Sequence, residues 1–162
     1  MTSKNGEPTG RRSAAQLDDV SKRIIEQLQE DGRRPYGAIG KAVGLSEAAV
    51  RQRVGRLTQS GVVQIVAVTD PMEVGLYRQA MLALKVGGAL EPVADALAAM
   101  DECEYVIICA GRYDLIAEVV CSDDEHLLEL ISQRIRTIEA VREVETLVYL
   151  KLAKQSYQWK VR

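Results

Sequence analysis

The sequence predicts an α+β protein, with an N-terminal three-helix helix-turn-helix domain followed by a ferredoxin-like βαββαβ domain. First, residues 39–57 have the pattern of two amphipathic helices joined at Gly44, and the second helix is rich in arginine. Second, residues 79–152 alternate strand-like and helical patterns in the order β-α-β-β-α-β. Third, residues 1–60 carry 11 Lys/Arg against 7 Asp/Glu, although the whole chain has a net charge of −2. A basic N-terminal part and an acidic remainder are typical of a nucleic-acid-binding domain joined to a domain with a different function.

The first predicted helix covers approximately residues 18–30. Its apolar positions recur at helical spacing and are Leu17, Ile24, Ile25 and Leu28. Gly-Arg-Arg-Pro at residues 32–35 ends the helix, because proline cannot continue it. With the two helices that follow, it makes a three-helix unit, the smallest helix-turn-helix domain able to bury its own core.

The helix-turn-helix signal itself lies in residues 39–57. The apolar positions of the two helices are Ile39, Val43 and Leu45, then Val50, Val54 and Leu57. Gly44 stands where the turn needs a positive φ or a close approach of the helices. Ser46 is then the expected N-cap of the second helix. Gly40 costs the first helix about 1 kcal/mol of helix propensity, and we expect it to allow closer packing.

The second helix of this pair has the composition of a helix that enters the major groove of DNA. Arginine forks pair with guanine edges and phosphates, and glutamine pairs with adenine. The residues predicted to contact DNA are Ser46, Glu47, Arg51, Gln52, Arg53 and Arg56. Two alternatives stay open. Such basic faces also occur on ordinary solvated helices, and Arg53 also fits an intramolecular pair that braces the domain.

The back half supplies the elements of the ferredoxin-like unit. Gly61 stops the helical region, residues 62–68 are strand-like, and the following residues form a linker. Strands are predicted at residues 79–86, 105–110, 115–121 and 144–152. One helix opens at Pro92. A second follows a capping box at residues 122–125 and is expected to bury Leu127, Leu128, Ile131, Ile135 and Ile138.

With both helices on one face of the sheet, the other face needs cover, and the sequence predicts it to be rich in Val, Ile, Leu and Ala. A second copy of the chain is the most economical cover, so a homodimer with packed sheets is expected. The predicted divisions are a disordered tail (1–14), a DNA-binding domain (15–61), a strand and linker (62–78), a βαββαβ domain expected to oligomerise (79–155) and a C-terminal tail (156–162).

Other classes of protein are less compatible with the composition. The sequence has no apolar run that would span a bilayer and no signal segment, so a cytoplasmic protein without membrane contact is expected. Its three cysteines have no metal-like spacing and there is one histidine, so we expect neither a disulfide framework nor a metal or other cofactor.

Together these motifs resemble the leucine-responsive regulator/asparagine regulator (Lrp/AsnC) family of transcription factors. The resemblance covers roughly residues 16–153, and its clearest motifs are Val43-Gly44-Leu45-Ser46, Arg53-Val54, Arg56-Leu57, Gly61-Val62-Val63, Gly111-Arg112-Tyr113-Asp114 and Glu145-Thr146-Leu147-Val148. It implies a DNA-binding head on a regulatory domain that dimerises, assembles into octamers or other higher forms, and binds a free amino acid between dimers. The implied effector-binding residues are Gly111, Tyr113, Asp114 and Thr146.

A separate physical argument supports an effector site at this turn. Asp114 would accept the ammonium of a free amino acid, and the backbone N–H groups of a glycine turn would hold its carboxylate. The alternative is a hairpin turn whose aspartate bonds only its own backbone. The expected effector is small or apolar, and the sequence leaves its identity open.

The leading hypothesis is therefore a sequence-specific transcriptional regulator that responds to a free amino acid. One alternative is a nucleoid-type architectural protein that binds DNA with little sequence preference. The less favoured alternative is an enzyme on the same fold. We predict no catalytic residue, because the single histidine, His126, is expected to be an exposed helix residue without a visible partner.

Overall fold

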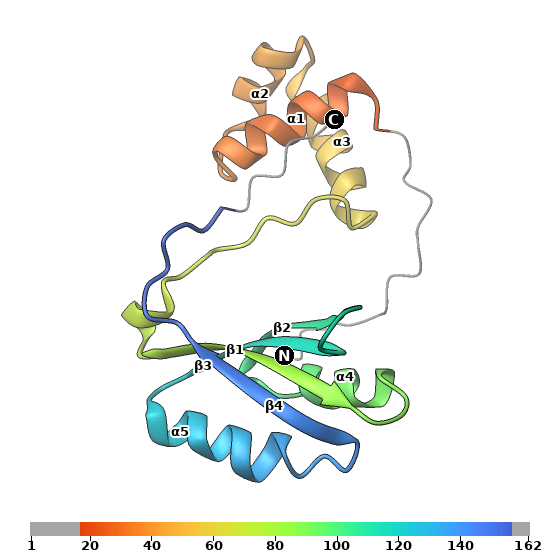
Figure 1. Ribbon diagram of the computed structural model, residues 1–162. Helices are drawn as coiled ribbons and strands as arrows, with labels where there is room; N and C mark the ends of the chain where they lie inside the picture. The colour runs from red at the N-terminus through yellow and green to blue at the C-terminus, as the bar shows by residue number, and fades with distance from the viewer. Residues whose placement is uncertain (1–16, 157–162) are drawn as a thin grey trace. The chain divides into compact units, whose positions relative to one another are not determined.

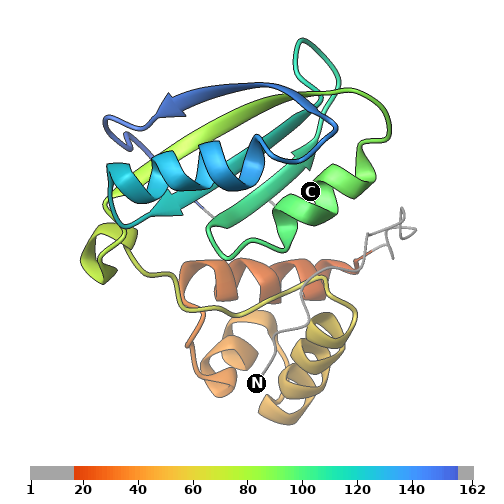
Figure 2. The same cartoon turned by 90° about the horizontal axis from the view of Figure 1, so that it is seen from below.

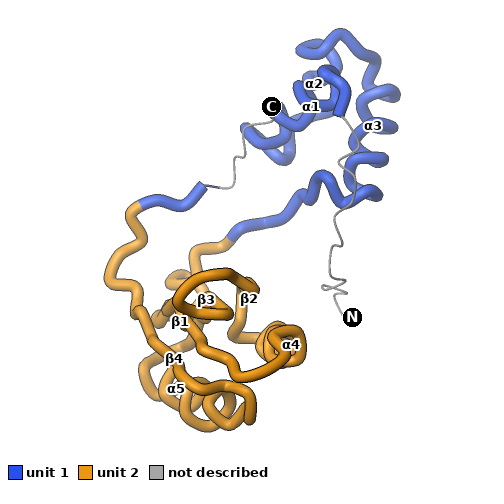
Figure 3. The backbone as a smooth tube through the Cα atoms, turned by 45° about the vertical axis from the view of Figure 1, so that its right-hand side comes forward, with its two compact units in different colours: residues 1–68, 154–162 blue, residues 69–153 orange. Residues whose placement is uncertain are grey.

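The computed structural model describes residues 17–156, so the predicted N-terminal tail and all but Ser156 of the C-terminal tail lie outside the described residues. The chain divides into two compact units, residues 1–68 with 154–162, and residues 69–153 (Figure 3). Between residues 17 and 156, no helix is both long enough and apolar enough to cross a membrane.

The first unit contains the three predicted helices, α1 (Asp19–Glu30), α2 (Tyr36–Val43) and α3 (Glu47–Gln59). The side chain of Asp18 caps α1 by accepting from the Ser21 N–H at 2.7 Å. The apolar stripes of the helices meet in one core formed by Ile24, Leu28, Ile39, Val43, Val50 and Val54. We call the described part of this helical unit, residues 17–61, the head. The predicted three-helix domain is confirmed.

The predicted strand at residues 62–68 is wrong for this chain taken alone. These residues form no strand in the structure, and most of their side chains are exposed. Val66, for example, keeps 69% of its accessible surface. β-branched residues favour extended backbone, but a strand also requires a neighbour that accepts and donates its ladder hydrogen bonds. No described segment of the chain supplies that neighbour.

The second unit begins with a 3₁₀ turn, η1 (Pro71–Val74), and then has the predicted βαββαβ order. Its elements are β1 (Arg78–Val86), α4 (Glu91–Ala98), β2 (Cys103–Ile108), β3 (Leu115–Cys121), α5 (Asp124–Glu129), the π-helical turn η2 (Leu130–Ile135) and β4 (Val141–Val148). The strands form one antiparallel sheet in the order β2-β3-β1-β4. Both α4 and α5 lie on the same face of this sheet (Figures 1 and 2). The ferredoxin-like prediction is confirmed.

The core of this unit lies between the sheet and its two helices. Buried side chains from alternate strand positions meet those of the helices; the fully buried members include Leu82, Leu84, Leu97, Leu115, Leu130 and Ile135. Alternation along a strand sends neighbouring side chains to opposite faces. The strand register therefore also fixes which residues lie on the face without helices.

Three local predictions in this unit need correction. The N-cap of α5 is Asp123, whose carboxylate accepts from the His126 N–H at 2.8 Å, so the capping box does not begin at Ser122. Leu128 is 65% exposed, whereas Leu130 is fully buried. Leu128 and Leu130 lie on opposite sides of the buried Leu127, about 100° and 60° away around the helix, and the side that faces the sheet is that of Leu130. Finally, β4 begins at Val141 and ends at Val148, earlier than predicted.

The face of the sheet without helices is more mixed than predicted. The register assigns twelve side chains to this open face: Gln79, Met81, Ala83, Lys85, Tyr105, Ile107, Ile116, Glu118, Val120, Glu143, Glu145 and Leu147. Large apolar groups on it remain accessible, with Ile107 at 48% and Leu147 at 51%. The prediction of an apolar face is thus correct for only part of the surface.

Candidate nucleic-acid interface and effector site

The turn between α2 and α3 is built by Gly44 and Ser46. Gly44 has φ 77°, in the left-handed region that favours glycine, and its N–H bonds back to the Gly40 carbonyl. Ser46 Oγ accepts from the Ala49 N–H at 3.2 Å and caps α3. The predicted role of Ser46 as the N-cap is confirmed. These two residues set where α3 begins and hence which of its side chains face solvent.

The exposed side of α3 carries the predicted DNA-contacting residues. Val50, Val54 and Leu57 are buried in the head, and Glu47, Arg51, Gln52 and Arg56 are exposed on the remaining surface. At 100° per residue, Gln52 and Arg56 lie opposite the buried stripe, while Arg51 and Arg53 lie on its two flanks. The structure therefore brings most of the predicted set to one accessible surface, with Arg53 as the exception.

Arg53 is engaged within the head. Its Nη1 donates to Asp18 Oδ2 at 2.6 Å and to Ser21 Oγ at 3.1 Å. The hydrogen bond from Arg53 is the largest cause that lowers the Asp18 pKa to about 2, so the Asp18 carboxyl group stays ionised near neutral pH. Arg53 thus ties α3 to the N-terminus of α1, which is the bracing alternative that the sequence left open.

Arg51 has two neighbours of a different kind. Its Nη2 donates to Glu47 Oε1 at 2.8 Å, one turn earlier on α3. Its guanidinium carbon lies 5.3 Å from the centre of the Tyr36 ring, at the start of α2. Sequence reasoning missed Tyr36 because no local spacing relates it to Arg51. The only local sign is its place directly after Pro35, where α2 begins.

Residues 109–114 form the second candidate site, which we call the effector turn. Gly111 has φ 148° and is exposed, and the Arg112 guanidinium lies 5.3 Å from the ring centre of Tyr113. The turn closes the hairpin of β2 and β3 through the Cys109 N–H, which donates to the Asp114 carbonyl at 3.0 Å. Gly111, Tyr113 and Asp114 are therefore brought together as predicted.

The Asp114 carboxylate already has partners in this unit. Oδ2 accepts from the Val86 N–H at 2.9 Å, and Oδ1 lies 3.5 Å from Lys85 Nζ. The Val86 N–H is the main cause that lowers the Asp114 pKa, and Lys85 adds to it. Asp114 thus anchors the end of β1, at the point where its register with β4 shifts. Lys85 is a second residue that sequence reasoning missed, since 29 positions separate it from Asp114.

Thr146 does not join the effector turn within one subunit. It pairs with Leu82 of β1, and β1 lies between β4 and the strand that follows the turn. Thr146 also shares the helix-covered face with Leu82, since directly paired residues point to the same side. Only a contact with another copy of the chain would bring Thr146 of one subunit to the effector turn of another.

The environment of His126 differs from the prediction. Its Nε2 lies 3.1 Å from Glu102 Oε1, and its Nδ1 lies 3.3 Å from Ser122 Oγ. Glu102 also accepts from Arg134. His126 is thus partly buried and partnered, not exposed and alone. The cluster connects the start of β2 to α5 and η2.

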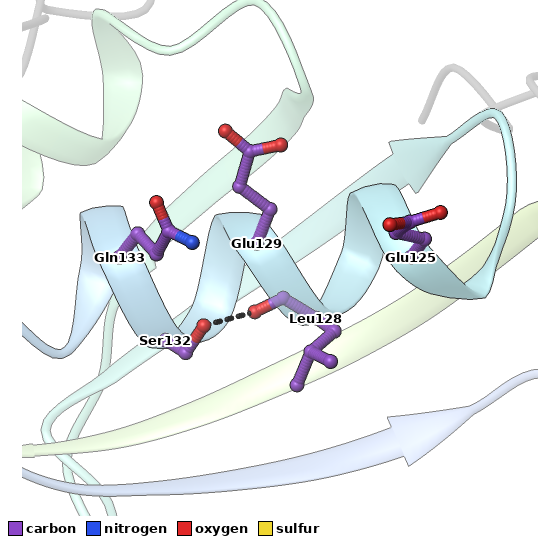
Figure 4. Close-up of a pocket in the computed structure, with 5 residues that line it drawn as sticks. All are labelled: Glu125, Leu128, Glu129, Ser132 and Gln133. Atoms are coloured by element: carbon purple, nitrogen blue, oxygen red, sulfur yellow. Dashed lines mark hydrogen bonds between the residues drawn. The ribbon is translucent and has the colours of Figure 1, made fainter.

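A shallow hollow lies on the outer side of α5 and η2. It is lined by Glu125, Leu128, Glu129, Ser132 and Gln133 (Figure 4). All five residues come from one continuous helical segment, and Ser132 Oγ donates to the Leu128 carbonyl. None of the predicted site residues lines this hollow. Within residues 17–156, no cluster of three or more His, Cys, Asp or Glu side chains is arranged to hold a metal ion.

Two protein families match the chain. Residues 17–58 match the AsnC-type helix-turn-helix domain, and residues 78–162 match a C-terminal dimeric alpha+beta barrel domain of AsnC-type regulators. The boundary between the matches falls in the segment that the structure shows without a strand. Both units of the chain are therefore covered by families of one kind of protein.

Known proteins support the same assignment. The HTH-type transcriptional regulator FL11 of Pyrococcus furiosus is 33% identical over 148 residues, which cover 90% of this chain and 97% of that protein. The leucine response regulatory protein LrpA of Mycobacterium tuberculosis has a TM-score of 0.80 and 29% identity, covering 90% of this chain and all of that one. A transcriptional regulator from Neisseria meningitidis, solved as a complex with L-Met, has a TM-score of 0.79 and 23% identity, over 87% and 94% of the two chains. The last comparison shows the fold alone.

Proposed function

We propose that this chain, which belongs to the AsnC/Lrp family of transcriptional regulators, reads specific DNA through α3 and changes its DNA binding when a free amino acid binds. One observation supports the first part above all. The exposed surface of α3 presents Gln52 and Arg56 opposite the head core and Arg51 on its flank, and these are side chains that contact base edges and phosphates. We place this activity in the cytoplasm, together with the DNA.

Selection from a random-sequence duplex library tests the proposed DNA binding. The full-length protein should enrich a roughly palindromic sequence, with half-sites one or two helical turns apart, because a dimer presents two heads. Arg56→Ala should weaken binding to the enriched duplex in a gel-shift titration. An architectural protein of the nucleoid type would instead retain DNA without enriching any sequence, and that result would contradict sequence-specific regulation.

We place the effector at the effector turn, where Lys85 and Asp114 offer charges opposite to those of a free amino acid. At neutral pH the amino acid carries an ammonium and a carboxylate, so it can replace the long 3.5 Å contact between Lys85 and Asp114 with two closer ones. Asp114 would accept the ammonium while keeping its bond from the Val86 N–H. Lys85 and the turn amides would hold the carboxylate. The L-Met complex of the Neisseria regulator is consistent with this class of ligand.

Calorimetric titration of Asp114→Asn with each free amino acid tests this site. Asparagine keeps an oxygen that can accept from the Val86 N–H but lacks the negative charge, so we expect at least a roughly tenfold loss of affinity for the effector. Asp124→Asn is the matched control, because it removes the charge of an aspartate that pairs with Arg78 at the other end of β1, and it should leave affinity unchanged. Undiminished affinity in folded Asp114→Asn would rule out this ammonium site.

The assembly that we propose follows from the same surfaces. The partly apolar open face is suited to pairing with the open face of a second copy, and the matching family is described as dimeric. We further propose that dimers associate into octamers or other higher forms. An amino acid bound between dimers would then favour one assembly over another and alter the spacing of the heads.

A further inference from the structure

Two neighbouring side chains of the head hold Arg51 in place, unlike the other exposed arginine of α3. Glu47 holds its Nη2 at 2.8 Å, and the ring of Tyr36 lies 5.3 Å from the guanidinium carbon. The second oxygen of Glu47 lies against α2, where a Cβ on Gly37 would be 3.3 Å from it. Arg56 has no such neighbours among residues 17–156. We call Tyr36 and Glu47 the Arg51 cradle.

A gain in helix stability does not explain why Arg51 has these two neighbours. The side chains of Arg51 and Glu47 are 65% and 57% exposed, and exposed ion pairs one helical turn apart contribute little to stability. Their effect on geometry is larger. A carboxylate on one nitrogen and an aromatic ring beside the guanidinium restrict both the position and the plane of an otherwise flexible side chain.

A fixed guanidinium plane matters for only one kind of DNA contact. A phosphate can be neutralised by a positive charge in many orientations, but the O6 and N7 atoms of guanine require two parallel N–H groups in the plane of the base. The pair with Glu47 uses one N–H of Arg51 and leaves the others for a second partner. The carboxylate of Glu47 also repels phosphates, which disfavours sequences that offer Arg51 no base edge.

We propose that Tyr36 and Glu47 are specificity-determining positioning residues that hold Arg51 for bidentate contact with a guanine in the major groove. This inference rests on the proposed DNA binding through α3 and assigns different tasks to the three arginines. Arg51 reads a base, Arg53 braces α3 against α1, and Arg56 neutralises phosphate.

The test compares two duplexes of equal length, one selected by the wild-type protein from a random library and one with the same bases in scrambled order. Arg51→Lys keeps the charge but loses the planar fork. We expect affinity for the selected duplex to fall by about 5- to 100-fold, while affinity for the scrambled duplex stays within about twofold. Arg56→Lys is the control and should change both affinities by the same small factor.

Substitutions of the two cradle residues, tested on both duplexes, decide whether the cradle determines specificity. Glu47→Gln should raise affinity for the scrambled duplex several-fold and lower the ratio of selected to scrambled binding. Tyr36→Leu should lower that ratio, whereas Tyr36→Phe, which retains the ring, should preserve it. In an Arg51→Lys background neither change should lower the ratio further, since residues that act through one group are not additive.

The outcomes separate this inference from the proposed function. If Arg51→Lys, or both Glu47→Gln and Tyr36→Leu, leave the ratio unchanged while Arg56→Ala still weakens binding, the cradle is overturned and DNA binding through α3 stands. If the wild-type protein prefers no sequence, the proposed function and the cradle fail together. Thermal unfolding of every variant identifies those that retain the folded head. Should Tyr36→Leu not fold, Glu47→Gln and Arg51→Lys decide the question.

Discussion

Gly40→Ala is expected to destabilise the head by about 2 kcal/mol, although alanine is the better helix former. A Cβ at Gly40 would lie 2.5 Å from the backbone carbonyl oxygen of Leu45, a group that cannot rotate away. Overpacking of this kind costs about 3 kcal/mol at the upper end of the usual range, and the gain in helix propensity returns only about 1 kcal/mol. Since the clash lies at the turn between α2 and α3, we also expect loss of selective DNA binding.

Gly55→Ala provides the matched control for Gly40→Ala. Gly55 lies within α3, and a Cβ there would meet no atom within 4 Å. Without a clash, alanine should raise the stability of the head by about 0.5–1 kcal/mol. Chemical denaturation of both full-length variants measures the two effects. Equal shifts in the same direction would show that helix propensity, and not the approach of α2 to the turn, controls both positions.

Ile107→Lys is expected to prevent the proposed dimer from forming and to reduce affinity for the selected duplex by about 10²-fold or more. Ile107 lies on the edge strand β2 and pairs with Ile116 of β3, and both side chains belong to the open face. A lysine there would lose its hydration if two open faces packed together, and burial of a charge in an apolar contact is costly. The loss of DNA affinity follows because two linked heads bind a palindrome far more tightly than one head does.

Leu128→Lys is the control for this substitution. Leu128 is also exposed and apolar, at 65% against 48% for Ile107, but it lies on α5, which covers the opposite face of the sheet (Figure 1). Light scattering at micromolar concentration should show at least a dimer for Leu128→Lys and a monomer for Ile107→Lys. A dimeric Ile107→Lys protein would contradict pairing through the open face.

Much of the fold could be predicted because its signals are local. Helical periodicity with Gly44 and Ser46 gave the three helices of the head, and glycine breaks between apolar runs gave the βαββαβ order. The errors arose where tertiary packing decides. Residues 62–68 have strand-like composition but no partner strand among the described residues. On α5, the apolar pattern around Leu127 did not determine which side of the helix faces the sheet, and Leu130 is buried while Leu128 is exposed.

The candidate sites were less predictable than the fold, for a related reason. Composition pointed to α3 and the family resemblance to the effector turn, yet the partners of Arg53 and of Asp114 lie far away in sequence. Asp18 precedes Arg53 by 35 positions, and Lys85 precedes Asp114 by 29. Spacing along one helix can predict the pair of Glu47 and Arg51. It cannot predict which arginine the tertiary fold uses as a brace.

The affinity for the selected duplex, measured with and without each free amino acid, tests most directly the claim that one chain couples DNA reading to an effector. We expect at least one amino acid to change this affinity by about fivefold or more, which is within the usual range of coupling between two sites. The same amino acid should raise the melting temperature of the wild-type protein, because a ligand that binds the folded state stabilises it. A protein that binds the selected duplex with the same affinity in the presence of every free amino acid would contradict the account.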